Sequence, residues 1–110
     1  VQLQEQGQLR AVDLWPGVDQ YDLRIVFNTG EVWAIDIKDI ANPGHLRSQL
    51  QQEPQFVNVG DLSWDKAWFV VPQYRCEWSR DYVRRATPEG FWAKVQGMRT
   101  FQKALKSTLK

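Results

Sequence analysis

The sequence predicts a single domain of the α/β class, a small mixed sheet with helices packed on it, and three observations support this prediction. Residues 21–27 alternate between apolar and polar side chains, as in a half-buried strand, and residues 28–30, Asn-Thr-Gly, are typical of a hairpin turn. Residues 31–38 and 66–72 are short apolar runs of the kind found in buried strands. Residues 43–53 have a helical pattern and are long enough to deliver the last strand parallel to a hairpin strand.

The ends of these elements carry their own signals. The strand at 31–38 is apolar on both faces except near its end, so we expect it at the centre of the sheet. Asn42 is a favourable N-cap, Pro43 is a favourable first helical residue, and Pro54 ends the helix. Apolar spacing predicts two further helices, at about 77–86 and 91–109.

Composition fits one globular domain spanning residues 1–110, because 43% of the residues are hydrophobic and 25% are charged. The chain opens with Val1 and not Met, so we expect a piece of a longer protein that lacks an upstream element. No apolar run approaches the roughly 20 residues that cross a bilayer, so we expect no membrane partner. Cys76 is the single cysteine, which excludes an internal disulfide and fits a cytoplasmic setting.

Charge is unevenly distributed along the chain. Residues 1–74 hold 5 Lys/Arg and 10 Asp/Glu, whereas residues 75–110 hold 9 Lys/Arg and 3 Asp/Glu. An acidic part beside a basic part suits a protein that holds a metal ion with one and a polyanion with the other. The alternative is an ordinary solvated helical surface that happens to be basic.

Three residues near the predicted hairpin point to chemistry. Asp36 and Lys38 are two apart on a strand, so their side chains share a face, and they interrupt an otherwise apolar run. If residues 28–30 form a three-residue loop with Gly30 in the left-handed conformation, Asp22 falls opposite Asp36 on that same face. A two-residue loop would instead place Asp22 opposite Ile37.

Two adjacent carboxylates repel each other unless a cation lies between them. A hard divalent ion, Mg²⁺ or Mn²⁺, fits such oxygen ligands, and the main-chain carbonyl of Ile37 is a candidate third ligand beside Asp22 and Asp36. Lys38 would orient or help deprotonate an attacking water, or stabilise charge on a phosphorane. The alternative is a surface salt bridge between Lys38 and either acid, which would stabilise the fold only slightly.

These residues resemble the PD-(D/E)XK nuclease superfamily, whose pattern is an Asp early in one hairpin strand and an Asp/Glu-x-Lys late in the next. The resemblance covers about residues 14–72. The runs from Leu14 to Ile25 and from Glu31 to Pro43 are similar to the restriction-endonuclease-like domains associated with prokaryotic Piwi-type proteins. The resemblance implies a restriction-endonuclease-like core and Mg²⁺-dependent cleavage of DNA in phage and plasmid defence. It also implies Piwi-like or helicase partners, and a homodimer where both strands are cut.

The resemblance also directs attention to supporting residues. Members often place a Glu on a helix before the hairpin, and only Glu5 could fill that role here, with Asp19 as a nearer alternative that could equally be a turn residue. Gln49 on the helix after the motif could support the site or lie on the surface. His45, the single histidine, is expected to be solvated, and with Cys76 it gives too few ligands for a zinc site. The candidates for phosphate contacts are basic residues, Lys66, Arg80, Arg84, Arg85, Lys94 and Arg99.

Two functions follow from the sequence. The first is a metal-dependent endonuclease with Asp22, Asp36 and Lys38 as its catalytic residues. The second is a non-catalytic module on the same fold that binds nucleic acid or an acidic protein surface through its basic half. Metal-dependent cleavage distinguishes the first from the second.

Overall fold

A computed structural model describes residues 9–14, 22–53, 56 and 64–109, and for residues 9–14 it describes the backbone alone. The candidates Glu5 and Asp19 lie outside these residues. Among the residues described, no helix has the length and apolar character needed to span a membrane.

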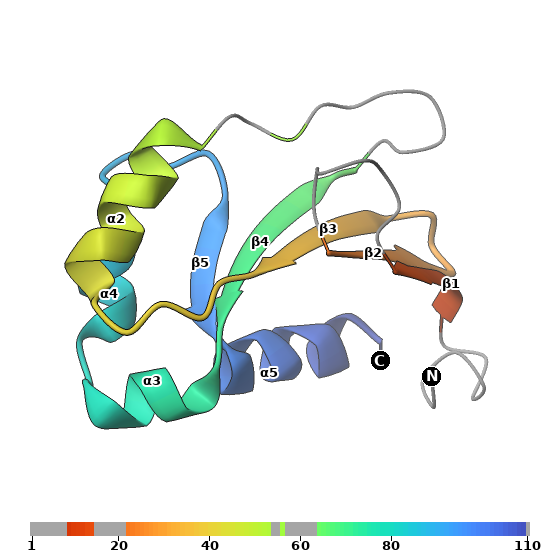
Figure 1. Ribbon diagram of the computed structural model, residues 1–110. Helices are drawn as coiled ribbons and strands as arrows, with labels where there is room; N and C mark the ends of the chain where they lie inside the picture. The colour runs from red at the N-terminus through yellow and green to blue at the C-terminus, as the bar shows by residue number, and fades with distance from the viewer. Residues whose placement is uncertain (1–8, 15–21, 54–55, 57–63, 110) are drawn as a thin grey trace.

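The described strands form one five-stranded mixed sheet in the order β1-β2-β3-β4-β5 (Figure 1). The first three strands pair antiparallel, and β4 and β5 continue the sheet parallel to β3. The central position of β3 and its parallel pairing with β4 confirm the predicted mixed sheet. The strands are β1 (Leu9–Leu14), β2 (Leu23–Phe27), β3 (Val32–Ile37), β4 (Lys66–Val71) and β5 (Lys94–Gly97).

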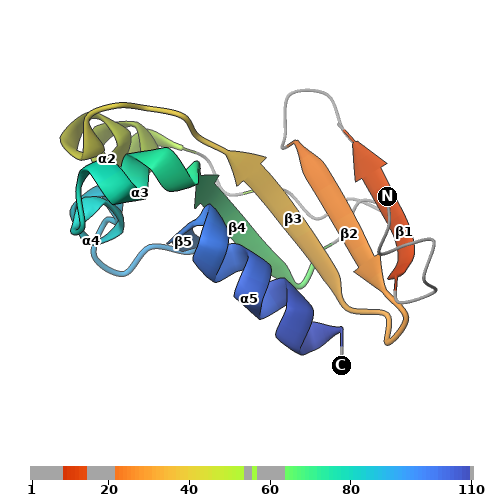
Figure 2. The same cartoon turned by 90° about the horizontal axis from the view of Figure 1, so that it is seen from below.

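Helices cover both faces of this sheet, and each face has its own apolar cluster. On one face, Phe101 of α5 packs against Trp33 and Trp68, with ring centroids 6.1 and 5.3 Å away. On the other, Leu46 and Leu50 of α2 join residues of α4 and of the sheet. Seen from below, α5 lies across its face of the sheet, with the other helices gathered at one end (Figure 2). The helices are α2 (Pro43–Gln52), α3 (Gln73–Trp78), α4 (Tyr82–Ala86) and α5 (Met98–Thr108).

The hairpin between β2 and β3 has the predicted three-residue turn. Gly30 has a φ of 95°, a left-handed conformation that glycine adopts without strain. Phe27 donates its N–H to the carbonyl of Glu31 at 2.9 Å, and the pairs of the ladder end with Leu23 opposite Ile35. This confirms the register that the sequence predicted.

Helix α2 begins as predicted and ends one residue earlier. The side-chain oxygen of Asn42 accepts hydrogen bonds from the N–H groups of Gly44 and His45, and Pro43 occupies the first turn. The last helical residue is Gln52, and Glu53 caps the end with extended backbone. The helix therefore carries the chain from the end of β3 back toward the start of β4.

The helix predicted at 91–109 is wrong at its start, because residues 94–97 form β5 and the helix begins only at Met98. The apolar side chains whose spacing predicted one helix over residues 91–109 in fact belong to two elements. Val95 packs with the α2 and α4 cluster, whereas Met98 and Phe101 pack on the opposite face. The predicted helix at 77–86 is likewise two short helices, since Ser79 takes extended backbone at the end of α3.

Candidate active site

The hairpin brings Asp22 and Asp36 together at the end of β3. Asp22 lies just before β2, and its main-chain N–H donates to the carbonyl of Ile35 at 3.0 Å. Its carboxylate oxygen Oδ2 accepts the N–H of Ile37 at 2.8 Å. Asp22 therefore binds the residues on either side of Asp36, which holds its side chain beside that acid.

Asp36 is a buried acid, with 9% of its surface exposed. It lies opposite Phe69 of β4 and two residues after Ala34, on the face that α2 and α4 cover. Burial raises the pKa of Asp36 to about 6, the nearby Lys38 opposes this rise, and contact with the Asp22 carboxyl adds to it. Burial therefore destabilises the ionised form of this carboxyl group. Carboxyl groups with raised pKa values are common at functional sites.

Lys38 completes the group from just beyond the end of β3. Its ammonium Nζ lies 3.0 Å from Oδ2 of Asp36 and 3.8 Å from Oε1 of Glu53. Its main-chain N–H donates to the carbonyl of Val70 at 3.0 Å, which fixes the strand end against β4. The side chain is 18% exposed, and Nζ lies 5.8 Å from the centre of the Phe69 ring. Lys38 is therefore held between two carboxylates at the rim of the sheet.

The two aspartates suit a hard divalent cation. A cation between Asp22 and Asp36 would offset the burial and the neighbouring carboxyl that together raise the pKa of Asp36. Within the part of the chain that the structure describes, no group of three or more His, Cys, Asp or Glu side chains is arranged to hold a metal ion. An ion here would therefore take its remaining ligands from main-chain oxygens, such as that of Ile37, from water or from substrate phosphate.

A comparison with protein-family models shows to which family the chain belongs. The model described as "REase associating with pPIWI_RE", in which REase stands for restriction endonuclease, matches residues 2–110. The chain belongs to this family. The match confirms the resemblance to restriction-endonuclease-like domains associated with Piwi-type proteins. The comparison with curated proteins found no match, and neither did the comparison with solved structures.

In this member of the pPIWI_RE-associated REase family, Glu53 joins the candidate site, which the sequence did not reveal. It follows α2 directly, its side chain is 22% exposed, and it reaches Lys38 from an element other than the hairpin. One signal in the sequence was its place between a helix and Pro54, where the chain must turn. Its distance to Lys38 depends on how α2 crosses the sheet.

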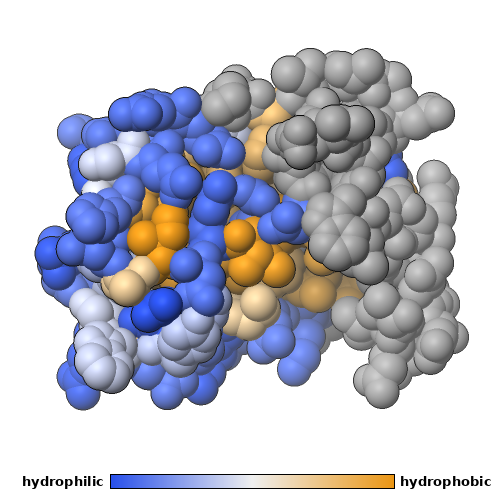
Figure 3. All heavy atoms as spheres, in the orientation of Figure 1, coloured by the Kyte–Doolittle hydropathy of each residue, from blue (hydrophilic) through white to orange (hydrophobic). Residues whose placement is uncertain are grey.

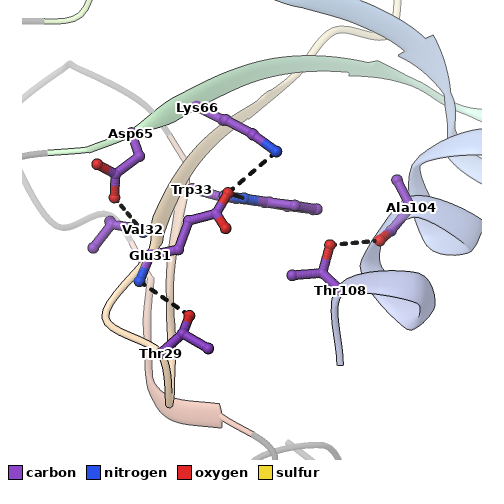
Figure 4. A network of polar contacts seen from close by, with 8 residues as sticks. All are labelled: Thr29, Glu31, Val32, Trp33, Asp65, Lys66, Ala104 and Thr108. Carbon is purple, nitrogen blue, oxygen red and sulfur yellow. Dashed lines mark hydrogen bonds and ion pairs between the residues drawn. The ribbon is translucent and has the colours of Figure 1, made fainter. Parts of the chain in front are cut away.

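Two predicted phosphate contacts, Lys66 and Lys94, lie away from the acids. Lys66 opens β4, and its Nζ lies 3.2 Å from Oε1 of Glu31 (Figure 4). It pairs with Trp33, three residues before Asp36 along β3. The Nζ atoms of Lys66 and Lys94 lie 5.7 and 5.6 Å from the Trp33 and Trp68 rings, on the face that α5 covers. The structure therefore does not bring these two lysines to the Asp22 and Asp36 pair.

The other basic candidates lie on the helices that follow β4, except Arg80, which lies in the turn between α3 and α4. Arg80 and Arg85 are exposed, and Arg84 forms an ion pair of 3.2 Å with Asp81. Arg99, in the first turn of α5, lies 4.0 Å from Glu77 of α3. Gln49 and His45 are exposed on α2. These arginines lie on or between α3, α4 and the start of α5, at the end of the sheet where the candidate site lies (Figure 1).

Proposed function

We propose that this chain is a metal-dependent endonuclease domain that hydrolyses phosphodiester bonds of DNA with Mg²⁺ or Mn²⁺. Asp22 and Asp36 would hold the metal ion, with the carbonyl of Ile37 as a further ligand, and Lys38 would act on the attacking water or the phosphate. The domain would work beside a Piwi-type protein in defence against phages and plasmids. The family match supports the restriction-endonuclease class, and the residues of the hairpin support the chemistry.

The observation that carries this proposal is the buried Asp36, in contact with both Asp22 and Lys38. An ordinary surface salt bridge would lie in water, and its ammonium partner would lower the pKa of the acid. Here the acid is buried and its pKa is raised to about 6 in spite of an ammonium 3.0 Å away. A buried acid beside a second carboxyl, whose charge Lys38 compensates only in part, is better explained by metal binding than by a salt bridge.

The residues divide the chemistry as follows. When bound, the metal ion would polarise the phosphate and lower the pKa of a bound water. Asp22 holds its carboxylate in place through the N–H of Ile37, which leaves its other oxygen for the ion. Lys38 places a positive charge beside Asp36, where it can stabilise negative charge developing on the phosphate. Glu53 keeps that ammonium from swinging into solvent.

Cleavage of supercoiled plasmid DNA with Mg²⁺ or Mn²⁺ tests the proposal. We expect Asp36→Asn and Lys38→Ala each to lower the nicking rate by at least about 100-fold, because each removes a group that acts on the transition state. Asp81→Asn is the matched control, since Asp81 is an acid paired with Arg84 on the surface. Both site variants should keep the circular dichroism spectrum of the parent chain.

Two results would count against this function. Equal nicking by the parent chain and by both site variants would show that the activity arises elsewhere. Calorimetry that detects no binding of Mg²⁺ or Mn²⁺ at millimolar concentrations would instead favour a binding module that requires no metal.

A further inference from the structure

Helix α3 presents two aromatic rings to solvent. Trp78 is 92% exposed and Tyr74 is 54% exposed, and the two are one helical turn apart on the same side of the helix. In the space-filling view, pale side chains of this kind gather over α3 at the lower left of the molecule (Figure 3). Neighbouring aromatic side chains that are this exposed commonly mark a binding site.

The surroundings of these rings are held in place. The hydroxyl of Tyr74 donates to Asp39, and Nε of Arg75 lies 2.8 Å from the other oxygen of that carboxylate. The guanidinium of Arg75 in turn lies 4.8 Å from the centre of the Tyr74 ring. The patch is therefore partly preorganised, which lowers the entropy that a ligand must overcome on binding.

A hollow opens beside the rings. It has a volume of about 240 Å³ and is lined by Ala41, Arg75, Trp78, Ser79 and Tyr82. Of these, the exposed Trp78 ring and the Arg75 guanidinium are groups on which a flat ring can stack, whereas Tyr82 is buried.

This patch adjoins the candidate active site. Asp39, which binds Tyr74 and Arg75, directly follows Lys38, and α3 begins directly after β4, the strand beside β3 (Figure 1). Residues 73–86 also carry four arginines and two acids; Arg75 is paired with Asp39 and Arg84 with Asp81, and the exposed Arg80 and Arg85 add positive charge for a polyanion.

We propose that the surface of α3, centred on Trp78 and Tyr74, binds single-stranded DNA by stacking unpaired bases beside the candidate active site. This inference rests on the proposed function for its choice of DNA. Exposed rings can stack only on bases that are not already stacked inside a duplex, and arginines at the edge suit the phosphates between them. A protein would be a poorer match for this arginine-rich surface, although exposed Trp, Tyr and Arg also occur in protein interfaces.

Binding without cleavage tests the surface separately from the catalytic proposal. The parent chain and variants are titrated into a fluorescein-labelled oligo-dT strand in EDTA, with fluorescence anisotropy as the readout. We expect Trp78→Ala to weaken binding at least about fivefold and Trp78→Phe, which keeps a ring, to recover most of the affinity. Gln102→Ala is the control, because Gln102 is an exposed, uncharged side chain on α5. Trp78 is so exposed that its removal should leave the fold intact.

Two further measurements identify the ligand. Binding of oligo-dT should quench tryptophan fluorescence in the parent chain and quench it less in Trp78→Ala, because stacking on a base quenches the indole. A blunt duplex should bind Trp78→Ala and the parent chain with similar affinity. These measurements are made in EDTA, where no metal-dependent cleavage occurs, so failure of the nuclease proposal would leave their result unchanged.

Several outcomes would overturn the inference. One is equal affinity of Trp78→Ala and the parent chain for oligo-dT. Another is a loss that appears with oligo-U and not with oligo-dT, which would assign the surface to RNA. A third is unchanged oligo-dT binding combined with lost co-purification of a pPIWI_RE protein, which would assign it to a protein partner.

Discussion

At the scale of single residues, the ionisation of Asp36 links the candidate site to the stability of the fold. The folded chain holds the proton of this carboxyl more tightly than the unfolded chain does, because its pKa rises from 3.8 to about 6 on folding. Deprotonation between these two values therefore favours the unfolded state. The sign is the reverse of the usual stabilised carboxylate, whose pKa falls on folding.

We therefore expect the contribution of Asp36 to the stability of the metal-free chain to decrease as the pH rises from about 4 to about 6, and to change little above that. Asp36→Asn cannot ionise, so the variant should lack this part of the pH dependence. Urea unfolding of both proteins at several pH values between 4 and 7 measures the difference. A constant difference in unfolding free energy over that range would contradict the assignment.

Glu53 gives a second prediction at this scale. Glu53→Gln removes a charge 3.8 Å from the Lys38 ammonium but leaves the pair of Lys38 and Asp36 in place. Partly exposed ion pairs contribute about 0–1 kcal/mol, so we expect kcat for DNA cleavage to fall by up to about fivefold. KM should stay nearly constant, since Glu53 acts through Lys38. A loss as large as that of Lys38→Ala would mean that Glu53 contacts the metal ion or the substrate itself.

At the scale of elements, the junction of β5 and α5 depends on close packing against α3. A Cβ atom added at Gly97 would lie 2.7 Å from Sγ of Cys76, which is closer than such atoms approach in proteins. We expect Gly97→Ala to lower the unfolding free energy by about 1–3 kcal/mol, measured by urea denaturation. The double variant Cys76→Ala with Gly97→Ala should recover much of this loss, because it removes the clashing sulfur. Additive effects of the two changes would show that the sulfur is not the cause.

The elements also show how far the sequence predicted the fold. The hairpin and the start of α2 could be predicted because local chemistry determines them: Gly30 permits the turn, and Asn42 caps the helix. The four residues of β5 could not, since Val95 fits a helical spacing as well as a strand. Only its pairing with β4 makes that segment extended, and this pairing depends on residues distant in the sequence.

At the scale of the whole molecule, the two apolar clusters lie on opposite faces of the sheet, and only one of these faces carries the acids of the candidate site. Phe101→Ala should cost about 3–5 kcal/mol of unfolding free energy, because the ring packs on Trp33 and Trp68. The acids lie on the other face, so the fraction that remains folded should bind Mn²⁺ with the affinity of the parent chain. Urea denaturation and calorimetry measure the two quantities. A large loss of Mn²⁺ affinity in the folded fraction would show that α5 supports the site through the sheet.

The candidate site itself could be predicted only in part. Asp22, Asp36 and Lys38 could be found because strand alternation and one turn fix their relation. Glu53 and the exposed rings of α3 could not, because their places depend on how helices cross the end of the sheet. Individual basic residues were least predictable, as Lys66 illustrates by pairing with Glu31 instead of approaching the acids.

The length of the Asn28-Thr29-Gly30 turn has a consequence for recognising inactive relatives. This turn is at the far end of the hairpin from the acids, yet it sets which residue of β2 faces Asp36. Losing or gaining one residue there would rotate Asp22 to the other side of the sheet, while every acidic and basic letter of the motif stayed in the sequence. A genome survey that checks only for these motif residues would count such a gene as intact. Comparing the lengths of the hairpin turn would instead show that its two acids no longer share a face of the sheet.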